Sequence, residues 1–242
     1  MVAKTTATTD FNLDLNNMVE EAFERCGAEL RSGYDMRTAR RSLNLLTMEW
    51  ANKGINLWTI EQGEQVLTAG LGEYDLPADT VDLLDHVIRT GTGTNQSDLT
   101  ISRISVSTYA SIPSKNNTGR PIQVWFQRKT GATDSAGDVV YPQIHVWPKP
   151  DTSQTYTFVY WRMRRMLDAG NGINGQDVPF RFIPCMVAGL AYHLAKKIPG
   201  AEPRIQMLKA DYDEAWEWAS TEDREKASNR FVPRVGYIGG GG

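Results

Sequence analysis

The most constraining stretch of the sequence is residues 178–223, which predicts two helices separated by a sharp break. In the first helix, apolar residues recur at intervals of three and four and so share one face: Phe182, Ile183, Met186, Val187, Leu190, Ala191, Leu194 and Ile198. We expect Asp177 to cap this helix, with Pro179 in its first turn and Pro199-Gly200 at its end. The second helix, with Pro203 near its start, has the same spacing in Ile205, Leu208, Tyr212, Ala215, Trp216 and Ala219. Two such helices cannot bury both apolar stripes against each other, so the pair needs further helices as partners.

The N-terminal part of the chain contains the other strong helical periodicity. Residues 11–31 have an apolar stripe formed by Phe11, Leu15, Met18, Val19, Ala22, Phe23, Cys26 and Leu30, and we expect Ser32-Gly33 to end this helix. Asp35 is the expected cap of the next helix, which ends at Gly54 and has Met36, Ala39, Leu43, Leu46 and Trp50 on one face. The short link predicts an antiparallel hairpin. Both ends of the chain should therefore contribute to one helical layer.

Between these helix pairs, the apolar pattern becomes that of short strands. Runs that begin at Leu57 are separated by glycines, and further extended runs cover 100–106, 121–129, 143–148 and 155–163. In the last run, Tyr156, Phe158 and Tyr160 are expected on one face of the strand. Residues 107–113 predict one helical turn, and 149–154 is expected to join the last two strands as a hairpin. Strands at this spacing predict an antiparallel sandwich or a small barrel.

The predicted fold class is therefore α+β, with a helical bundle built from N- and C-terminal helix pairs and an inserted antiparallel β domain, sandwich or barrel-like. The expected bounds are 1–10 for a disordered N-terminus, 11–56 together with 176–223 for the helical domain, 57–175 for the β domain, and 224–242 for an extended C-terminal arm. The arm has no helical periodicity and should be mobile when alone.

Composition limits the classes of function. The net charge of −3 argues against a protein whose main task is to hold nucleic-acid phosphates, because that task needs a clustered basic surface. No apolar run approaches the roughly 18 residues of a membrane span, and the N-terminus is not typical of a signal peptide, so a cytoplasmic protein is expected. Cys26 and Cys185 lie on apolar helix faces, which predicts buried free thiols.

We find no sequence pattern typical of catalysis, of a cofactor or of a metal site. His86, His145 and His193 are far apart and lack the spacing of zinc ligands, and GTGTNQ departs from the dinucleotide-binding fingerprint. The acids Asp79, Asp82 and Asp85 could crowd on one helical turn. A solvated acidic edge is the favoured interpretation over paired acid/base or metal carboxylates.

Two further groups of residues allow more than one interpretation. Trp58, Trp125, Trp147 and Trp161 are expected on β strands, where core or subunit-interface roles are favoured over sugar binding. The basic residues of 161–165 indicate either a solvated strand end or a contact with nucleic acid.

Taken in order, these segments resemble a known family. The helix pair is followed by EYDLPAD (73–79), by STYASIPSKNNTGRPIQVW (107–125), by 144–170 with its Trp-Pro-x-Pro at 147–150, and by 178–199. In this order and spacing the chain resembles the head-to-tail adaptor proteins of short-tailed double-stranded DNA bacteriophages, the group that includes tail tubular protein A. The resemblance runs from residue 11 to about residue 233.

The resemblance implies a structural virion protein and not an enzyme. It implies a homo-oligomeric ring of twelve copies, built by the helical domain beneath the portal protein of a filled capsid. The ring would join the portal to the tail nozzle protein at the head-tail junction, as part of the tail tube, and double-stranded DNA would pass through it during genome ejection. Assembly would take place in the host cytoplasm, with no membrane contact.

The resemblance also places the portal interface on the C-terminal arm. The arm residues expected there are Arg224, Arg230, Phe231, Val232, Arg234, Val235, Tyr237 and Ile238. Two alternative functions remain open from the sequence: a nucleic-acid-binding module, and a carbohydrate-binding or carbohydrate-hydrolysing tail protein.

Overall fold

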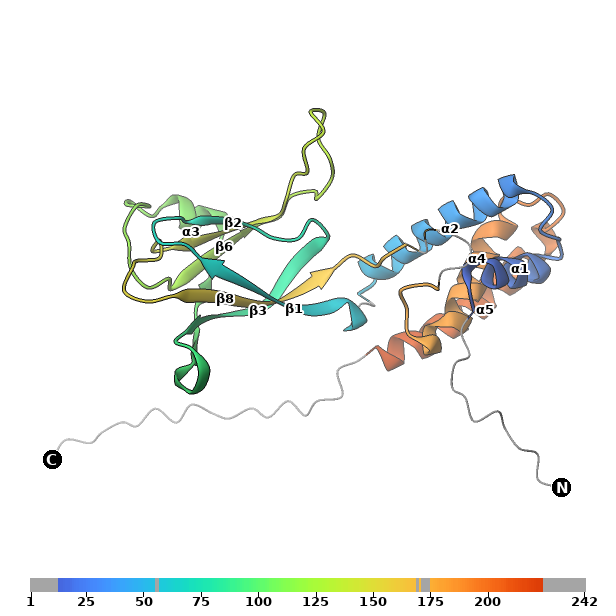
Figure 1. Ribbon diagram of the computed structural model, residues 1–242. Coiled ribbons are helices and arrows are strands. Elements are labelled where there is room, and N and C mark those ends of the chain that lie inside the picture. Colours follow the sequence, from blue (N-terminus) through green and yellow to red (C-terminus); the bar gives the residue numbers. More distant parts are fainter. Residues whose placement is uncertain (1–12, 55–56, 169, 171–174, 224–242) are drawn as a thin grey trace, which may run out of the picture.

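The computed structural model describes residues 13–54, 57–168, 170 and 175–223. Helices from both ends of the chain gather at one end of the molecule, and the strands from its middle lie at the other (Figure 1). The described residues form five α-helices and two four-stranded sheets, so the fold class is α+β, as predicted. Within the described residues the strands form no barrel, which removes that alternative.

The first two helices begin and end at residues other than those predicted. α1 (Leu15–Cys26) ends five residues early because Gly27 adopts a left-handed conformation with φ 76°, which glycine adopts without steric penalty. α2 (Gly33–Asn52) is capped by Ser32 and not by Asp35. Asp35 instead completes a capping box, in which its carboxylate accepts the Ser32 N–H at 3.2 Å.

The start of the third long helix also differs from the prediction. A 3₁₀ turn (Phe180–Phe182) precedes α4 (Ile183–Ala195), whose first turn contains Pro184 and not Pro179. Asp177 does not cap α4, because its carboxylate accepts from the Arg164 side chain and from the Leu167 N–H instead. The second C-terminal helix, α5 (Ile205–Glu222), follows a 3₁₀ turn that contains Pro203, close to where its start was expected.

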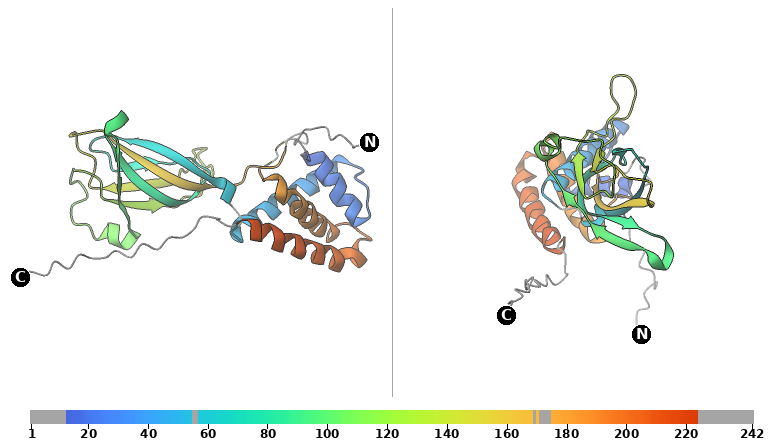
Figure 2. Two further views of the ribbon diagram at one scale, coloured as in Figure 1. Left: turned by 90° about the horizontal axis from the view of Figure 1, so that it is seen from below. Right: turned by 90° about the vertical axis from the view of Figure 1, so that its left-hand side faces the viewer.

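α4 is the central helix of the helical part. Its residues are buried almost all round, including Cys185, Ala188 and Gly189 outside the predicted stripe. Such a helix needs neighbours on several sides, and α1, α2 and α5 all pack against it (Figure 2). The antiparallel hairpin predicted for α1 and α2 is not a packing unit of its own, since these two helices make their main contacts with α4.

The hydrophobic core of the helical part combines residues from both ends of the chain. Leu15, Met18, Leu46 and Trp50 share one cluster with α4 and α5 residues such as Leu190. Cys26 and Cys185 lie in the same cluster as free thiols, as predicted, and burial raises their pKa values to about 11 and about 12. None of the helices that the structure describes is both long and apolar enough to cross a membrane.

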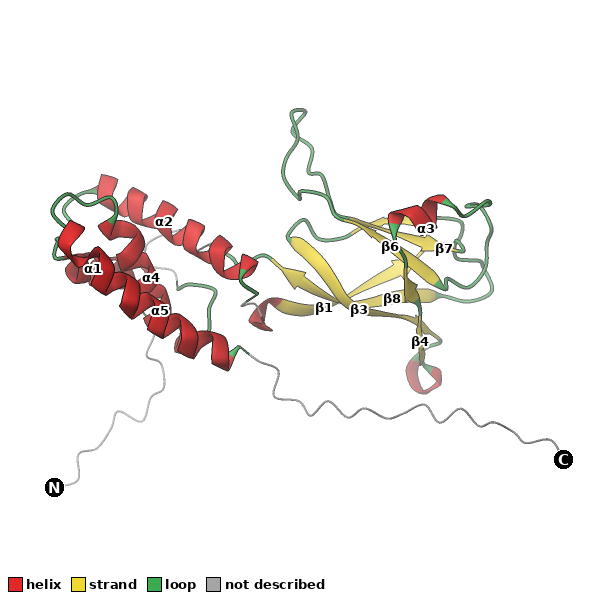
Figure 3. Cartoon of the chain, turned by 180° about the vertical axis from the view of Figure 1, so that it is seen from behind, coloured by secondary structure: helices red, strands yellow, loops and turns green. Residues whose placement is uncertain are grey.

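The strands form two sheets (Figure 3). The first has the order β1-β8-β3-β4, formed by Ile60–Leu67, Tyr156–Arg164, Thr80–Thr90 and Ser97–Thr100. The second has the order β2-β7-β6-β5, formed by Glu73–Asp75, Gln143–Trp147, Gln123–Gln127 and Ser102–Arg103. All neighbours are antiparallel except β5 and β6. The predicted helical turn is present as α3 (Val106–Ala110).

The connection between the last two strands contradicts the predicted hairpin. β7 and β8 belong to different sheets, so the segment between them crosses from one sheet to the other. The reason is hydrophobic: Ile144 and Val146 of β7 and one face of β8 (Tyr156, Phe158 and Tyr160) line a core that the two sheets share. The shared face predicted for Tyr156, Phe158 and Tyr160 was therefore correct, whereas the predicted hairpin between the two strands was not.

Candidate functional site

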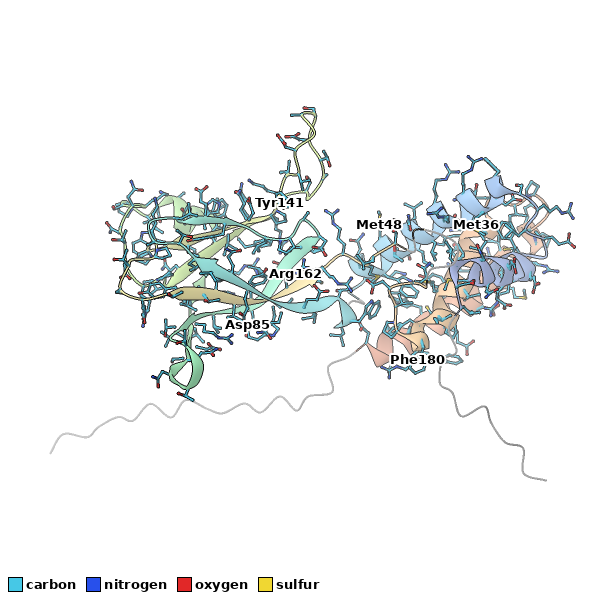
Figure 4. All side chains as sticks on the ribbon, viewed as in Figure 1. Met36, Met48, Asp85, Tyr141, Arg162 and Phe180 are labelled. Atoms are coloured by element: carbon cyan, nitrogen blue, oxygen red, sulfur yellow. The ribbon has the colours of Figure 1, made fainter. Side chains whose placement is uncertain are left out.

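The most highly organised polar group of the described residues lies where the strands meet the helices. β8 ends there with two inward arginines, Arg162 and Arg164, two positions apart and thus on the same face of the strand. Figure 4 shows Arg162 at the end of the strand part that faces the helices. We call Arg162 and Arg164, with the three carboxylates of Glu61, Asp79 and Asp177, the junction network.

Arg162 holds the strand side of the junction network. It is only 8% exposed, and it donates to Asp79 Oδ1 at 2.6 Å and to Glu61 Oε2 at 2.9 Å. Glu61 stands directly opposite Arg162 in the β1–β8 register. A buried guanidinium needs such partners, because removal from water disfavours an unpaired charge. The carboxylates of Asp79 and Glu61 therefore allow the Arg162 side chain to be buried at the end of the first sheet.

Arg164 connects the strands to the start of the C-terminal helices. Its Nε donates to Glu61 Oε1 at 2.6 Å, and its Nη2 donates to Asp177 Oδ1 at 3.2 Å. Asp177 also accepts the Leu167 N–H at 2.9 Å, while its backbone carbonyl accepts Trp58 Nε1 at 2.7 Å. The Trp58 ring packs on Phe182 with centroids 4.9 Å apart. One aspartate thus joins β8, the Trp58 turn and the segment that leads into α4.

Within the junction network, the pairing of Arg164 with Asp177 stabilises the charged form of both side chains. Burial alone would raise the Asp177 pKa, but the hydrogen bonds from Arg164 and Leu167 and the Arg164 charge outweigh burial and lower it. The hydrogen bond to Asp177 is the largest of the contributions that raise the pKa of Arg164. Groups held in one charge state are suited to positioning two parts of a protein and unsuited to proton transfer at neutral pH.

Replacing Asp177 by asparagine should destabilise the protein in a pH-dependent way. At pH 7 we expect Asp177→Asn to lower the free energy of unfolding by about 1–3 kcal/mol, because charged hydrogen bonds become neutral. The folded-state pKa of Asp177 is lowered, so its contribution is complete above about pH 4 and is lost as pH falls through that lowered pKa. Urea unfolding at pH 7, 5 and 3 measures this.

The matched control for this experiment is Asp211→Asn, which changes an exposed carboxylate on α5. It should alter stability by less than about 0.5 kcal/mol at each pH. A destabilisation by Asp177→Asn that is equal at all three pH values would contradict the ionic role of this residue.

The predicted acidic cluster does not exist as a helical turn. Asp79 precedes β3, and Asp82 and Asp85 lie on this extended strand. Asp79 pairs with Arg162, and Asp82 forms ion pairs with Arg103 and with Arg128. Asp85 accepts the N–H of His86. The favoured interpretation, a solvated acidic edge, is wrong for Asp79 and Asp82, whose negative charges are balanced by arginines.

The basic residues of 161–165 also differ from both interpretations. Arg162 and Arg164 are held by carboxylates in the junction network, and Arg165 donates to the Thr130 carbonyl. They form neither a solvated strand end nor a free basic patch. In the sequence, the two arginines alternate with apolar residues along one strand, and this spacing would have placed both side chains on the same face.

The three histidines lie apart. Burial lowers the pKa of each, against the opposing effect of a nearby acid: Asp85 for His86, Glu73 for His145 and Glu49 for His193. His193 is partly buried, and its Nε2 lies 3.5 Å from Glu49 Oε2. Among the residues that the structure describes, no three His, Cys, Asp or Glu side chains lie close enough together to hold a metal ion.

Three of the four tryptophans predicted on strands have ring or hydrogen-bond contacts within the chain. Trp58 lies in a 3₁₀ turn (Leu57–Thr59) and not on a strand, which corrects the prediction. Trp125 stacks on His145 with ring centroids 4.4 Å apart, and Trp147 Nε1 donates to the Ser114 carbonyl at 2.9 Å. Trp161 is half-buried on β8. These contacts give the rings structural partners.

The predicted portal-interface residues lie outside the described residues, which end at residue 223 on this side. They are Arg224, Arg230, Phe231, Val232, Arg234, Val235, Tyr237 and Ile238. The last described residue on this side is Asp223, whose side chain accepts the N–H of Leu57 at 3.2 Å.

Comparison with known proteins adds a result that covers almost the whole chain. A family model described as SU10 adaptor protein matches residues 14–234. The match includes the helices, both sheets, the junction network and the first part of the C-terminal arm. No curated protein matches the sequence.

Proposed function

The chain belongs to the SU10 adaptor protein family, and on this premise we propose that it forms a ring between the portal and the tail of a bacteriophage. Family membership makes it a structural phage adaptor, as the resemblance implied, and the family is not an enzyme family. The more detailed likeness to tail tubular protein A stays a prediction, as do twelve copies and the passage of double-stranded DNA through the ring during ejection.

The observation that carries this proposal is the extent of the family match. It begins at residue 14, the N-cap of α1, and ends at residue 234, eleven residues beyond the described part of the chain. A match over both structural parts and into the arm indicates one functional unit. The adaptor role implies contacts with a portal protein and with a tail nozzle protein, at the head-tail junction of the virion and after assembly in the host cytoplasm.

We assign different tasks to the two ends of the molecule. The two separate hydrophobic cores support a helical domain (11–56 with 176–223) arranged as a bundle, and a β domain (57–175) arranged as a sandwich. In the proposal the helical domain builds the ring and the β domain points toward the nozzle. The junction network supports this division, since it would keep the β domain in a fixed direction relative to the ring.

The two alternative functions receive no support from the side-chain contacts. A nucleic-acid-binding module would use the arginines of 161–165, and Arg162 and Arg164 already bind carboxylates. A carbohydrate-active protein would use open aromatic faces beside acids, and Trp125 stacks on His145 while Trp58 packs on Phe182. The adaptor function is therefore the one that the family match and the contacts support best.

In solution we expect a monomer or a weak oligomer, and a closed ring only on the portal. The sequence contains no long, wholly apolar surface of the kind that holds permanent rings together. Light scattering at micromolar concentration measures the mass. A stable large ring without the portal would overturn this order of events while leaving the adaptor role intact.

Negative-stain imaging of DNA-filled heads tests the proposed function itself. Heads mixed with the protein should show a ring at the portal vertex that is absent from heads alone. Heads without a portal are the control and should remain bare. Protein spread over the capsid, or no protein at the portal, would refute the proposal.

A further inference from the structure

We infer that neighbouring copies of this chain join through their helical ends, with the outer face of α2 on one copy seated on an acidic groove between α1 and the start of α4 on the next. The inference rests on the proposed ring and assigns its contact surfaces. The outer face of α2 consists of Tyr34, Arg37, Arg41, Leu45 and Met48. The acidic groove is defined below by its own residues.

The outer face of α2 is a stripe of exposed large side chains. Its residues recur at intervals of three and four along the side of the helix opposite the buried Leu43 and Leu46. Tyr34 is 63% exposed, Leu45 56% and Met48 62%. Scattered exposed apolar residues are normal, but an ordered stripe that alternates with arginine has the composition of a protein interface.

This face also has positive charge without a local counterpart. Arg37 and Arg41 of this face line a hollow of about 540 Å³ together with Tyr34 and the neighbouring Arg40 and Asn44, and no acid is among these lining residues. Arg40 donates to the Gly170 carbonyl and Arg41 to Thr38 Oγ1. Within the described ranges, no carboxylate forms an ion pair with any of the three arginines. Their charge is thus available to a partner.

The acidic groove has the complementary character. It is a hollow of about 760 Å³ whose lining includes Glu20, Glu21, Glu24, Phe180 and Pro184. Phe180 is 71% exposed, the largest exposed fraction among the large apolar side chains of the described chain. Glu21 pairs with Arg25 at 2.8 Å, whereas Glu20 and Glu24 form no ion pair within the described residues. Arg25 and Arg181 also line the groove, so its three glutamates exceed its basic residues by one, and Arg181 is engaged within the chain.

The two surfaces lie on different sides of the helical part. α1 and α2 each pack against α4 and make few contacts with one another. In Figure 4, Met48 lies along the upper edge of the helical part and Phe180 at its lower edge. Two different complementary patches on one molecule permit a heterologous contact, and such contacts generate rings when the rotation closes.

A second copy fits the outer face of α2 better than nucleic acid does. Phosphates would satisfy Arg37 and Arg41 but would leave Tyr34, Leu45 and Met48 without apolar partners. The acidic groove offers both carboxylates and the exposed Phe180 ring. An α2-to-α2 contact would place like charges together, which disfavours a symmetric dimer.

A cross-linking experiment with single-cysteine variants tests the pairing. Leu45→Cys and Phe180→Cys proteins are mixed at high concentration, and also on portal-bearing heads, with a bifunctional maleimide. Because Cys26 and Cys185 are only 3% and 2% exposed, the reagent should reach the introduced thiols alone. We expect cross-linked dimers in the mixture and at least about tenfold fewer with either variant alone. Lys209→Cys, on the exposed side of α5, replaces Leu45→Cys as the control and should not cross-link to Phe180→Cys.

Charge reversal provides an independent test of the same contact. Arg37→Glu/Arg41→Glu and Glu20→Arg/Glu24→Arg should each lower self-association about tenfold or more, and a mixture of the two should restore it, because opposite charges again face each other. Lys209→Glu should have no effect. A mixture that fails to recover, with both variants folded by circular dichroism, overturns the inference.

The outcomes separate this inference from the proposed function. Rings on the portal without the Leu45–Phe180 cross-link would overturn these contact surfaces and leave the adaptor ring standing. Cross-linked dimers in solution from a protein that never attaches to heads would support the surfaces and refute the ring at the portal. Salt-sensitive DNA binding lost in Arg37→Glu/Arg41→Glu, with no cross-link, would identify the face as a DNA contact instead.

Discussion

A chain that lacks residues 225–242 is expected to fold and yet fail to attach to DNA-filled, portal-bearing heads. In the segment 224–238, four basic residues and one acidic residue give a net charge of +3, opposite in sign to the −3 of the whole chain. Its apolar residues are spaced irregularly, which suits an extended segment that places side chains in separate pockets. The family match reaches residue 234 and so includes the first part of this segment.

The deletion is measured by sedimentation of heads with bound protein, and by the DNA that leaks from them. Circular dichroism should show an unchanged helical signal, because the described cores contain no residue beyond 223. We expect unattached protein and heads that lose DNA. If the shortened protein attaches as well as the intact one, the portal contact lies in the helices or the strands, and the eight arm residues have no docking role.

Within the arm, apolar anchors should matter more than a charged residue. Phe231→Ala/Tyr237→Ala is expected to weaken attachment by about 2 kcal/mol or more, since buried aromatic anchors dominate interface energetics. Lys226→Ala should change it by less than about 1 kcal/mol, as is usual for a charge at an interface rim. A titration of heads with labelled protein gives both values, and the reverse order would indicate a mainly electrostatic contact.

The sequence was sufficient for the helices because their apolar spacing is local. Leu43, Leu46 and Trp50 fall on one face whatever α2 packs against, and all three are buried. The position of α4 at the centre was not predicted, because its apolar stripe indicates one buried face and does not show that residues outside that face, such as Ala188 and Gly189, are also buried. The end of α1 was misplaced for a local reason: Gly27 was overlooked in favour of Ser32-Gly33.

Contacts between residues far apart in the sequence could not be predicted, either for the pairing of strands or for the junction network. Tyr156, Phe158 and Tyr160 share one face of β8 as expected, but nothing in the segment between β7 and β8 shows that it crosses between sheets. Arg162 and Arg164 meet acids from three distant segments, at positions 61, 79 and 177. That meeting depends on the β1–β8 register and on the path of the chain into α4, neither of which a single sequence fixes.

The second large effect is expected at the core shared by the two ends of the chain. Leu46 and Leu190 are both 0% exposed and belong to one cluster, although they lie on helices from opposite ends of the sequence. The fit is close there: a Cβ added to Gly189, next to Leu190, would come within 2.9 Å of Leu46 Cδ2. Core truncation removes buried methyl groups and leaves a cavity, so each leucine-to-alanine change should destabilise the protein by about 2–5 kcal/mol.

Urea unfolding followed by circular dichroism measures the free energy of unfolding of Leu46→Ala and Leu190→Ala. Leu45→Ala is the matched control, because it makes the same chemical change one residue away on the same helix, at a side chain that is 56% exposed. We expect the control to differ from the unmodified protein by less than about 0.5 kcal/mol in monomer stability. Equal effects at positions 45 and 46 would mean that α2 does not present its Leu46 side to α4, and the common core of the two chain ends would then be wrong.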